Sequence, residues 1–381
     1  MDKGYLIVSV YEENISLPLD NAMVKVIGDN YDNNFTTDIN GKTIPIVLDA
    51  PLKKYSLTPQ KEVRPYSVYT IEVSKSGYET TTINGVQVFP GETSLQNAFL
   101  KSNSPTVKVL SSSTVIDLPP NTLWENMQGI TSKNNINNIE NANDSRVYPN
   151  TLIPEYVIVH DGTPNNTSAP NYYVEFPEYI KNVAAGEIYS TWSKEAIKAN
   201  VYAIISFTLN RIYSEWYLSR GYKFTITSSP SYDQSYVPNR TTFKSISDVV
   251  DEIFNSYIEL PNRNYPFFAQ YNDGINTNNP GWLSQWGSQS LASQGYTALD
   301  ILKYYYIPEL KLVTADEIEG LPTSFPGYNL KTGSCGEPVQ KIQIMLNTIS
   351  GNYPALPKII PADGRYLDNT VTSVKKFQQI F

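Results

Sequence analysis

Apolar and polar positions alternate with a period of two through the first hundred residues, which is the pattern of half-buried β-strands. The stretches 6–10, 22–26 and 69–73 show this alternation most clearly. Pairs of turn-forming residues separate such stretches: Asp29-Asn30, Asn40-Gly41, Ser76-Gly77 and Pro90-Gly91. Short strands at this spacing predict an all-β sandwich over residues 1–102.

The alternation stops after residue 102. Nine asparagines fall between positions 121 and 150, and apolar residues are sparse there. Because such a segment buries too little apolar surface to offset the entropy of ordering it, we predict a flexible, exposed linker over residues 103–150. The linker is either a passive tether or a region of proteolytic cleavage, since proteases cut exposed chain.

A helical period begins in the next part of the chain. Ser193 is placed to cap the longest helical pattern, with Glu195 in its first turn. Further helices are predicted over 247–258 and 298–306. Apolar runs predict strands at 157–159, 223–227 and 267–271. Together these elements predict an α+β domain over residues 151–322.

The tail has its own amphipathic pattern. Residues 337–349 form one predicted helix, and a turn at Asp363-Gly364 leads into a second. We therefore predict a small α-helical module over residues 327–381. The expected fold class is multidomain, with an N-terminal all-β sandwich, a central α+β domain and this C-terminal module.

Charge and rare residues exclude several classes of function. The 29 basic and 37 acidic residues give a net charge of −8, so nucleic acid is not an expected partner. His160 and Cys335 are the only residues of their types. An internal disulfide is therefore impossible, and neither a zinc site nor any other cofactor is expected. No apolar stretch approaches the ~20 residues of a membrane span, and the N-terminus lacks the features of a secretory signal.

The aromatic content suits one class of ligand. The chain has 29 Tyr, 13 Phe and 5 Trp. Flat aromatic side chains beside amides and hydroxyls are suited to binding carbohydrate, although they serve equally well in a protein core.

Glu187 is the carboxylate whose surroundings in the sequence stand out. It lies between an apolar run, 183–186, and the aromatic residues Tyr189 and Trp192. Apolar surroundings disfavour the charged form of a carboxyl, so its pKa is expected to rise towards a value that is useful for proton transfer. A solvated surface glutamate is the alternative interpretation.

Three blocks of this region resemble the domains of the SpoIID/LytB family. Residues 179–200 read YIKNVAAGEIYSTWSKEAIKAN, where the family reads approximately Y-L-x-x-V-x-x-S-E-M-P-x-x-W-P-x-E-A-L-K-A-Q. Residues 233–236 match the family D-Q-x-Y block, and residues 281–287, GWLSQWG, are similar to its G-x-G-M-S-Q-x-G-A block. The three blocks, with the helical pattern that follows the last one, occur in the family order over about 130 residues.

The flanking regions carry resemblances of their own. The N-terminal pattern is loosely similar to carboxypeptidase-regulatory-like sandwiches. The tail resembles peptidoglycan-binding type 1 modules, although Leu367 stands where the family usually has Gly. The positions that carry this second resemblance are Leu330, Gly333, Gly336, Val339, Ile342, Leu346, Asp363, Gly364, Tyr366, Thr370, Val374 and Phe377.

This order of units resembles the clostridial spore cortex-lytic enzymes. The resemblance implies a lytic transglycosylase that cleaves the MurNAc–GlcNAc bond of cortex peptidoglycan during germination. It also implies a zymogen that is made in the mother cell without a Sec signal, is deposited in the cortex and coat region of the spore, and is activated by a germination serine protease. Cleavage is then expected between about residues 111 and 150.

The same resemblance assigns roles to individual residues. Glu187 would protonate the glycosidic oxygen and then accept the proton of the muramyl C6 hydroxyl. Candidates for hydrogen bonding to sugar are Gln234, Ser284 and Gln285, and candidates for stacking are Tyr236 and Trp286. Asp233 is expected to cap or orient, and His160 to be a structural loop residue. No metal site is expected, because the His and Cys that many members carry are missing here.

Two other classes of function remain open from the sequence. A non-catalytic peptidoglycan-binding or spore-structural protein would keep the fold without using Glu187. An amidase or peptidase acting on the stem peptide is the third class, but the lone His and the lone Cys argue against it.

Overall fold

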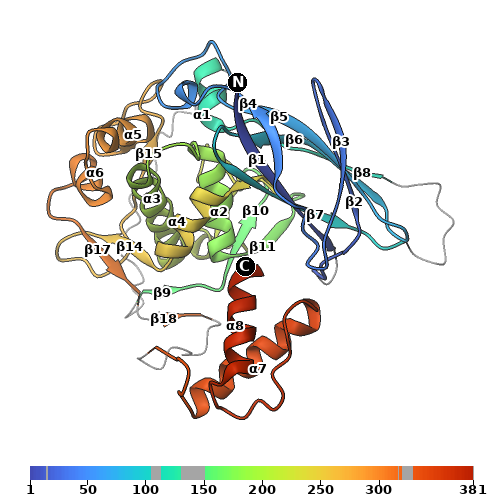
Figure 1. Cartoon of the computed structure of the whole chain (residues 1–381). Coiled ribbons are helices and arrows are strands. Elements are labelled where there is room, and N and C mark those ends of the chain that lie inside the picture. The colour runs from blue at the N-terminus through green and yellow to red at the C-terminus, as the bar shows by residue number, and fades with distance from the viewer. Residues whose placement is uncertain (14–15, 104–112, 130–150, 316, 320–328, 381) are drawn as a thin grey trace.

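The computed structural model describes residues 1–13, 16–103, 113–129, 151–315, 317–319 and 329–380. The described residues contain eight α-helices and several β-sheets, so the expected mixture of α and β structure is confirmed. Figure 1 shows the β-rich N-terminal residues beside a helical central part, with the two C-terminal helices forming a separate projection.

Two sheets built mainly from the N-terminal residues face each other across a common core. One has the order β3-β2-β5-β6-β8 and the other β13-β7-β1-β4. Alternate residues such as Val8, Val24 and Ile71 are fully buried between them, as the period of two predicts. The strands are β1 (Asp2–Glu12), β2 (Met23–Gly28), β3 (Tyr31–Thr36), β4 (Ile46–Ala50), β5 (Ser67–Ser74), β6 (Thr80–Val88), β7 (Thr93–Leu100), β8 (Ser113–Asp117) and β13 (Thr242–Phe243).

The prediction of a flexible linker over 103–150 is wrong for residues 113–129. Strand β8 pairs in parallel with β6, and helix α1 (Thr122–Gln128) follows it. Asn121 caps α1 by accepting a hydrogen bond from Leu123 N, and Gly129 ends the helix in the left-handed conformation. The local sequence pattern did not predict these two elements, because the contacts that order them come from residues far away in the chain, such as those of β6 and α2. Residues 104–112 and 130–150 lie outside the described part of the chain.

The central part is built around two buried helices. Helix α2 (Phe176–Glu187) and helix α3 (Lys194–Tyr213) lie against α4 (Lys244–Ile253), α5 (Gln285–Ser293) and α6 (Ala298–Tyr305). The predicted cap of α3 is confirmed, because Ser193 Oγ accepts from Ala196 N. Short strands complete this part: β9 (Leu152–Ile153), β10 (Tyr156–His160), β11 (Asn171–Glu175), β12 (Ile226–Thr227), β14 (Ser256–Glu259), β15 (Tyr271–Asn272), β16 (Leu283–Ser284), β17 (Lys311–Thr314) and β18 (Glu317–Ile318).

The predicted helix over 247–258 ends too late. Helix α4 starts at Lys244 and ends at Ile253, and the next residues form β14, which pairs antiparallel with β17. Tyr257 and Ile258 are consecutive and both buried, a pattern that suits a helix as well as a fully covered strand. The pairing with β17, about fifty residues later, decides between the two.

The N-terminal sheets and the central part share one hydrophobic core. Strand β13 of the central part pairs with β7 and so becomes an edge of an N-terminal sheet. Phe89, at the end of β6, contacts both Tyr189 and Phe243, with ring centroids 5.4 and 5.2 Å away. All three side chains are almost completely buried. The two regions are therefore joined through this cluster, in addition to the core that lies between the N-terminal sheets.

The C-terminal residues form the helix pair that the pattern predicts. Helix α7 (Glu337–Asn352) packs against α8 (Asp368–Ile380) around Leu346, Leu356 and Ile359. The Gln343 side chain bonds Thr370 and the backbone of Gly364, and so ties the two helices to the turn between them. Lys42 Nζ donates to the Ile380 carbonyl, which places the end of α8 against the N-terminal sheets.

Candidate active site

Glu187 is the last residue of helix α2. The helix begins after Glu175, with Pro177 in its first turn, and it buries Ile180, Val183 and Ala184 on one face. Residue Ile188 is extended and ends it. The end of α2 therefore presents the carboxyl at the negative end of the helix dipole, which disfavours a carboxylate.

The Glu187 carboxyl is buried, and only one of its two oxygens accepts a hydrogen bond. Its residue exposure is 6%; Oε1 accepts a hydrogen bond from Ser235 N at 2.8 Å, while Oε2 has no partner. The phenol of Tyr271 adjoins the carboxyl, but its Oη meets hydrogen-bond geometry with no group. Burial raises the pKa of Glu187, and the hydrogen bond from Ser235 N–H and the charge of Arg240 oppose that rise. Such a carboxyl is suited to donating a proton.

Arg240 is the cation whose charge acts on Glu187. Its guanidinium lies over Gly186, where an added Cβ would be only 2.2 Å from Nη1. Nη2 donates to Ser235 Oγ at 3.1 Å. Burial lowers the pKa of Arg240 to about 10, so the group is still charged at neutral pH. Gly186 is therefore needed to let this charge approach the end of α2.

A network of buried side chains holds the segment 233–236 against Glu187. Asp233 forms an ion pair with Arg211 at 2.8 Å, and its other oxygen accepts from Tyr217 Oη and Thr227. The amide of Gln234 is fully buried. Its oxygen accepts from Tyr179 Oη and Thr208 Oγ1, and its nitrogen donates to the Ile204 carbonyl. Ser235 N is thereby fixed at the carboxyl.

The candidate sugar-binding residues lie in two segments that flank Glu187. Gln234 and Tyr236 belong to the segment just described, and Tyr236 stacks on Tyr179 with ring centroids 5.7 Å apart. Ser284 lies in β16, which pairs with the strand that carries Tyr271, and its Oγ accepts from Gly287 N. Gln285 follows in α5 and is buried.

Two of these residues have structural contacts that occupy them. The Gln234 amide is used by the network above, and Trp286 belongs to the core with a ring centroid 5.1 Å from that of Trp192. Trp286 Nε1 has no hydrogen-bond partner. For all five residues, contact with sugar stays a prediction.

The sequence reasoning did not single out Tyr271 or Arg240. Tyr271 lies at the end of a predicted strand, and nothing in its local pattern indicates that it faces a carboxyl more than eighty residues earlier. Arg240 is one of many basic residues in the sequence. Burial distinguishes both residues, and burial is a property of the fold.

No metal centre is indicated among the described residues, which contain no group of three or more His, Cys, Asp and Glu side chains able to hold an ion. His160 is buried, stacks on Phe224 and bonds Asn171 through Nδ1. Within the same residues, no helix is both long and apolar enough to cross a membrane.

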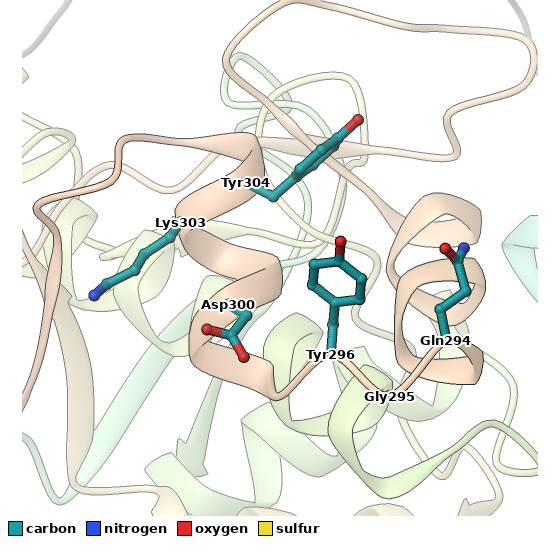
Figure 2. Close-up of a pocket in the computed structure, with 6 residues that line it drawn as sticks. All are labelled: Gln294, Gly295, Tyr296, Asp300, Lys303 and Tyr304. Carbon is teal, nitrogen blue, oxygen red and sulfur yellow. The ribbon is translucent and has the colours of Figure 1, made fainter.

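A hollow of about 510 Å³ lies elsewhere, between the end of α5 and α6. Figure 2 shows Tyr296 standing between Gln294 and α6, with Tyr304 above it and Lys303 pointing away. Glu187 does not line this hollow. The carboxyl site itself is closed to solvent in this conformation, because Glu187 is 6% exposed and its Oε2 is buried.

Comparisons with known proteins add little. No family model matches the chain, and no curated protein matches it. Among solved structures, the Bacillus anthracis TIE protein is 18% identical, with a TM-score of 0.19 over 27% of this chain and 17% of that one. Klebsiella pneumoniae 5-hydroxyisourate hydrolase is 14% identical, with a TM-score of 0.19; the match covers 26% of this chain and 92% of the hydrolase. Sea bream transthyretin is 16% identical, with a TM-score of 0.15; the match covers 28% of this chain and 95% of transthyretin. The chain spans about a sixth of the TIE protein.

Proposed function

We propose that this protein is a lytic transglycosylase that cleaves the MurNAc–GlcNAc bond of spore cortex peptidoglycan during germination. The observation that carries the proposal is the buried Glu187 carboxyl, which has a raised pKa and one unpartnered oxygen. The sequence blocks that surround it resemble the SpoIID/LytB family. A purely structural protein gains nothing from burying a carboxyl whose hydrogen bonds are incomplete.

A single proton-transferring carboxyl favours this reaction over hydrolysis. Hydrolytic glycosidases commonly use two carboxyls. Of the other two carboxyls in the family blocks, Asp233 is committed to Arg211, Tyr217 and Thr227. Glu195 accepts a hydrogen bond from Ala298 N. In a lytic transglycosylase the nucleophile belongs to the substrate, so a second carboxyl is unnecessary.

The proposed reaction uses Glu187 twice. The protonated carboxyl donates its proton to the glycosidic oxygen, and the C1–O bond to GlcNAc breaks. The resulting carboxylate accepts the proton of the muramyl C6 hydroxyl, whose oxygen bonds to C1 and leaves a 1,6-anhydro product. Ser235 N–H holds Oε1 in both states, which leaves Oε2 to exchange the proton.

The arrangement of units is part of the proposal. Residues 1–102 would act as a pro-domain, 151–322 as the catalytic domain and 327–381 as a peptidoglycan-binding module. The chain would be a zymogen in the cortex and coat region of the spore, cut by a germination serine protease. Residues 113–129 include strand β8 and helix α1. Cleavage is therefore proposed in the other residues of the range 111–150, outside 113–129.

Product analysis tests the reaction. Purified cortex peptidoglycan is digested with the protease-treated protein, and the soluble fragments are analysed by mass spectrometry. Anhydro-muramyl ends are expected, and Glu187→Gln is expected to lower their rate of release by at least about 100-fold. Glu178→Gln, on the exposed side of the same helix, is the matched control. Hydrated reducing ends, or full activity of Glu187→Gln, would contradict the proposal.

A further inference from the structure

The end of helix α2 is closed by side chains that come from another part of the chain. The last carbonyls of a helix have no partner within it and need donors from elsewhere. Around Glu187, Asn121 Nδ2 donates to the carbonyls of Ala185 and Ile188, both at 3.1 Å. Thr122 Oγ1 donates to the Gly186 carbonyl at 3.0 Å. The carbonyls on either side of Glu187 are therefore held by two consecutive residues.

Asn121 is completely buried, and both its side-chain oxygen and its side-chain nitrogen form hydrogen bonds. Its Oδ1 accepts from Leu123 N at 3.0 Å, and its own backbone N–H donates to Tyr66 Oη at 3.1 Å. One residue thus caps α1, closes the end of α2 and contacts the N-terminal sheets through Tyr66. A polar side chain in this position is expensive to leave unpaired.

Helix α1 also contacts the second segment of the site. The Asn126 carbonyl accepts from Asn276 Nδ2 at 2.9 Å. Asn276 lies in the turn that Asp273 Oδ1 organises, just after Tyr271. Leu123 anchors α1 in the core that α2 shares. The helix therefore contacts both the end of α2, which carries Glu187, and the turn that follows Tyr271.

A glycan cannot reach Glu187 while this arrangement persists. The residue is 6% exposed, and its Oε2 is buried. We propose that α1, through Asn121 and Thr122, is an inhibitory latch that locks the end of α2 and the 273–277 turn around Glu187. This proposal rests on the proposed function. It makes α1, rather than the N-terminal sheets as a whole, the element that must leave.

The test weakens the latch in the uncut protein. Thr122→Val is nearly isosteric and removes only the bond to Gly186. Asn121→Ala removes the bonds to the Ala185 and Ile188 carbonyls, together with the cap of α1 at Leu123 N. The matched control is Gln128→Ala, at the far end of α1, where the side chain donates only to the exposed Lys61 region. Release of anhydro-muramyl products is measured before and after protease treatment for each variant.

Uncut Asn121→Ala is expected to exceed the uncut wild type by about tenfold, because two hydrogen bonds no longer favour the closed state. Thr122→Val should show a smaller gain of the same sign, and Gln128→Ala none. All cut proteins should be alike. Uncut variants as inactive as the wild type, with normal activity after cutting, would overturn the latch.

Hydrogen exchange gives a second readout that does not depend on activity. Amides 187–189 should exchange faster in Asn121→Ala and Thr122→Val than in the wild type, while Gln128→Ala leaves them unchanged. Unaltered exchange in both variants would also overturn the proposal. If the cut wild type releases no anhydro product, the proposed function fails, and the exchange rates still decide whether α1 locks the end of α2.

Discussion

The raised pKa of Glu187 links its chemistry to protein stability. Burial makes the folded state bind a proton more tightly than the unfolded state, where the pKa is about 4.3. Folding is therefore helped below the unfolded pKa, and this contribution is lost as the pH rises through the folded pKa. A catalytic carboxyl held in this way costs stability at neutral pH.

Glu187→Gln should accordingly stabilise the protein at neutral pH while lowering turnover by at least about 100-fold. The amide keeps an acceptor for Ser235 N and cannot ionise. The gain in free energy of unfolding should be of the order of 1 kcal/mol at neutral pH and should shrink as the pH falls towards about 4.3. Urea unfolding from pH 4 to pH 8 measures it. A gain that is independent of pH would contradict the raised pKa.

Turnover should not require a metal ion. The described residues offer no cluster of ligands, and proton transfer by one carboxyl needs no Lewis acid. Dialysis of the active protein against a strong chelator, with elemental analysis before and after, should leave the rate unchanged. Stoichiometric zinc whose removal abolishes turnover would show that the mechanism is incomplete.

At the scale of elements, the buried Arg211–Asp233 pair connects α3 to the segment that holds Glu187. Both side chains are almost fully buried, and the Arg211 guanidinium also lies 4.5 Å from the Trp216 ring centroid and 4.7 Å from that of Phe268. Asp233 lies two residues before Ser235, so the ion pair also fixes the position of the Ser235 N–H that bonds Glu187. The pair therefore contributes to the geometry of the site as well as to its charge balance.

Asp233→Asn should destabilise the protein by about 3 kcal/mol, because it leaves the Arg211 charge buried without an anion. Asp248→Asn is the control, since its ion pair with Lys244 is exposed and spans one helical turn. That change should cost less than about 0.5 kcal/mol. Urea unfolding followed by Trp fluorescence compares the two variants. Equal effects would mean that the buried pair has no special role.

At the scale of the whole molecule, the shared core predicts that the N-terminal sheets and the central part unfold together. Phe89→Ala removes a ring from between Tyr189 and Phe243 and should cost about 3–5 kcal/mol. All five Trp lie at position 124 or later, so fluorescence follows the central part, whereas far-UV circular dichroism also follows the sheets.

The two signals should give one coincident transition in the wild type, shifted as a whole in Phe89→Ala. Val47→Ala is the control, because this strand residue is about half exposed and does not belong to the shared core. Separate transitions for the two signals would show that the N-terminal sheets unfold independently.

Local pattern was sufficient for elements whose partners lie nearby in the sequence. The alternation in β1, β2 and β5, the Ser193 cap of α3 and the amphipathic α7 could all be predicted, because each depends on a period or a cap that a short window contains. The sequence also singled out Glu187 from its apolar neighbours, and the structure buries it.

Long-range contacts decided the rest. Helix α1 is ordered by Tyr66 and by the end of α2, β14 is a strand because β17 lies beside it, and β13 belongs to a sheet formed by residues more than a hundred positions earlier. Tyr271 and Arg240 reach Glu187 only through the fold. The sequence by itself therefore determined the local elements and the candidate carboxyl. Tertiary structure decided what surrounds that carboxyl, because desolvation and hydrogen bonding depend on atoms that are distant along the chain.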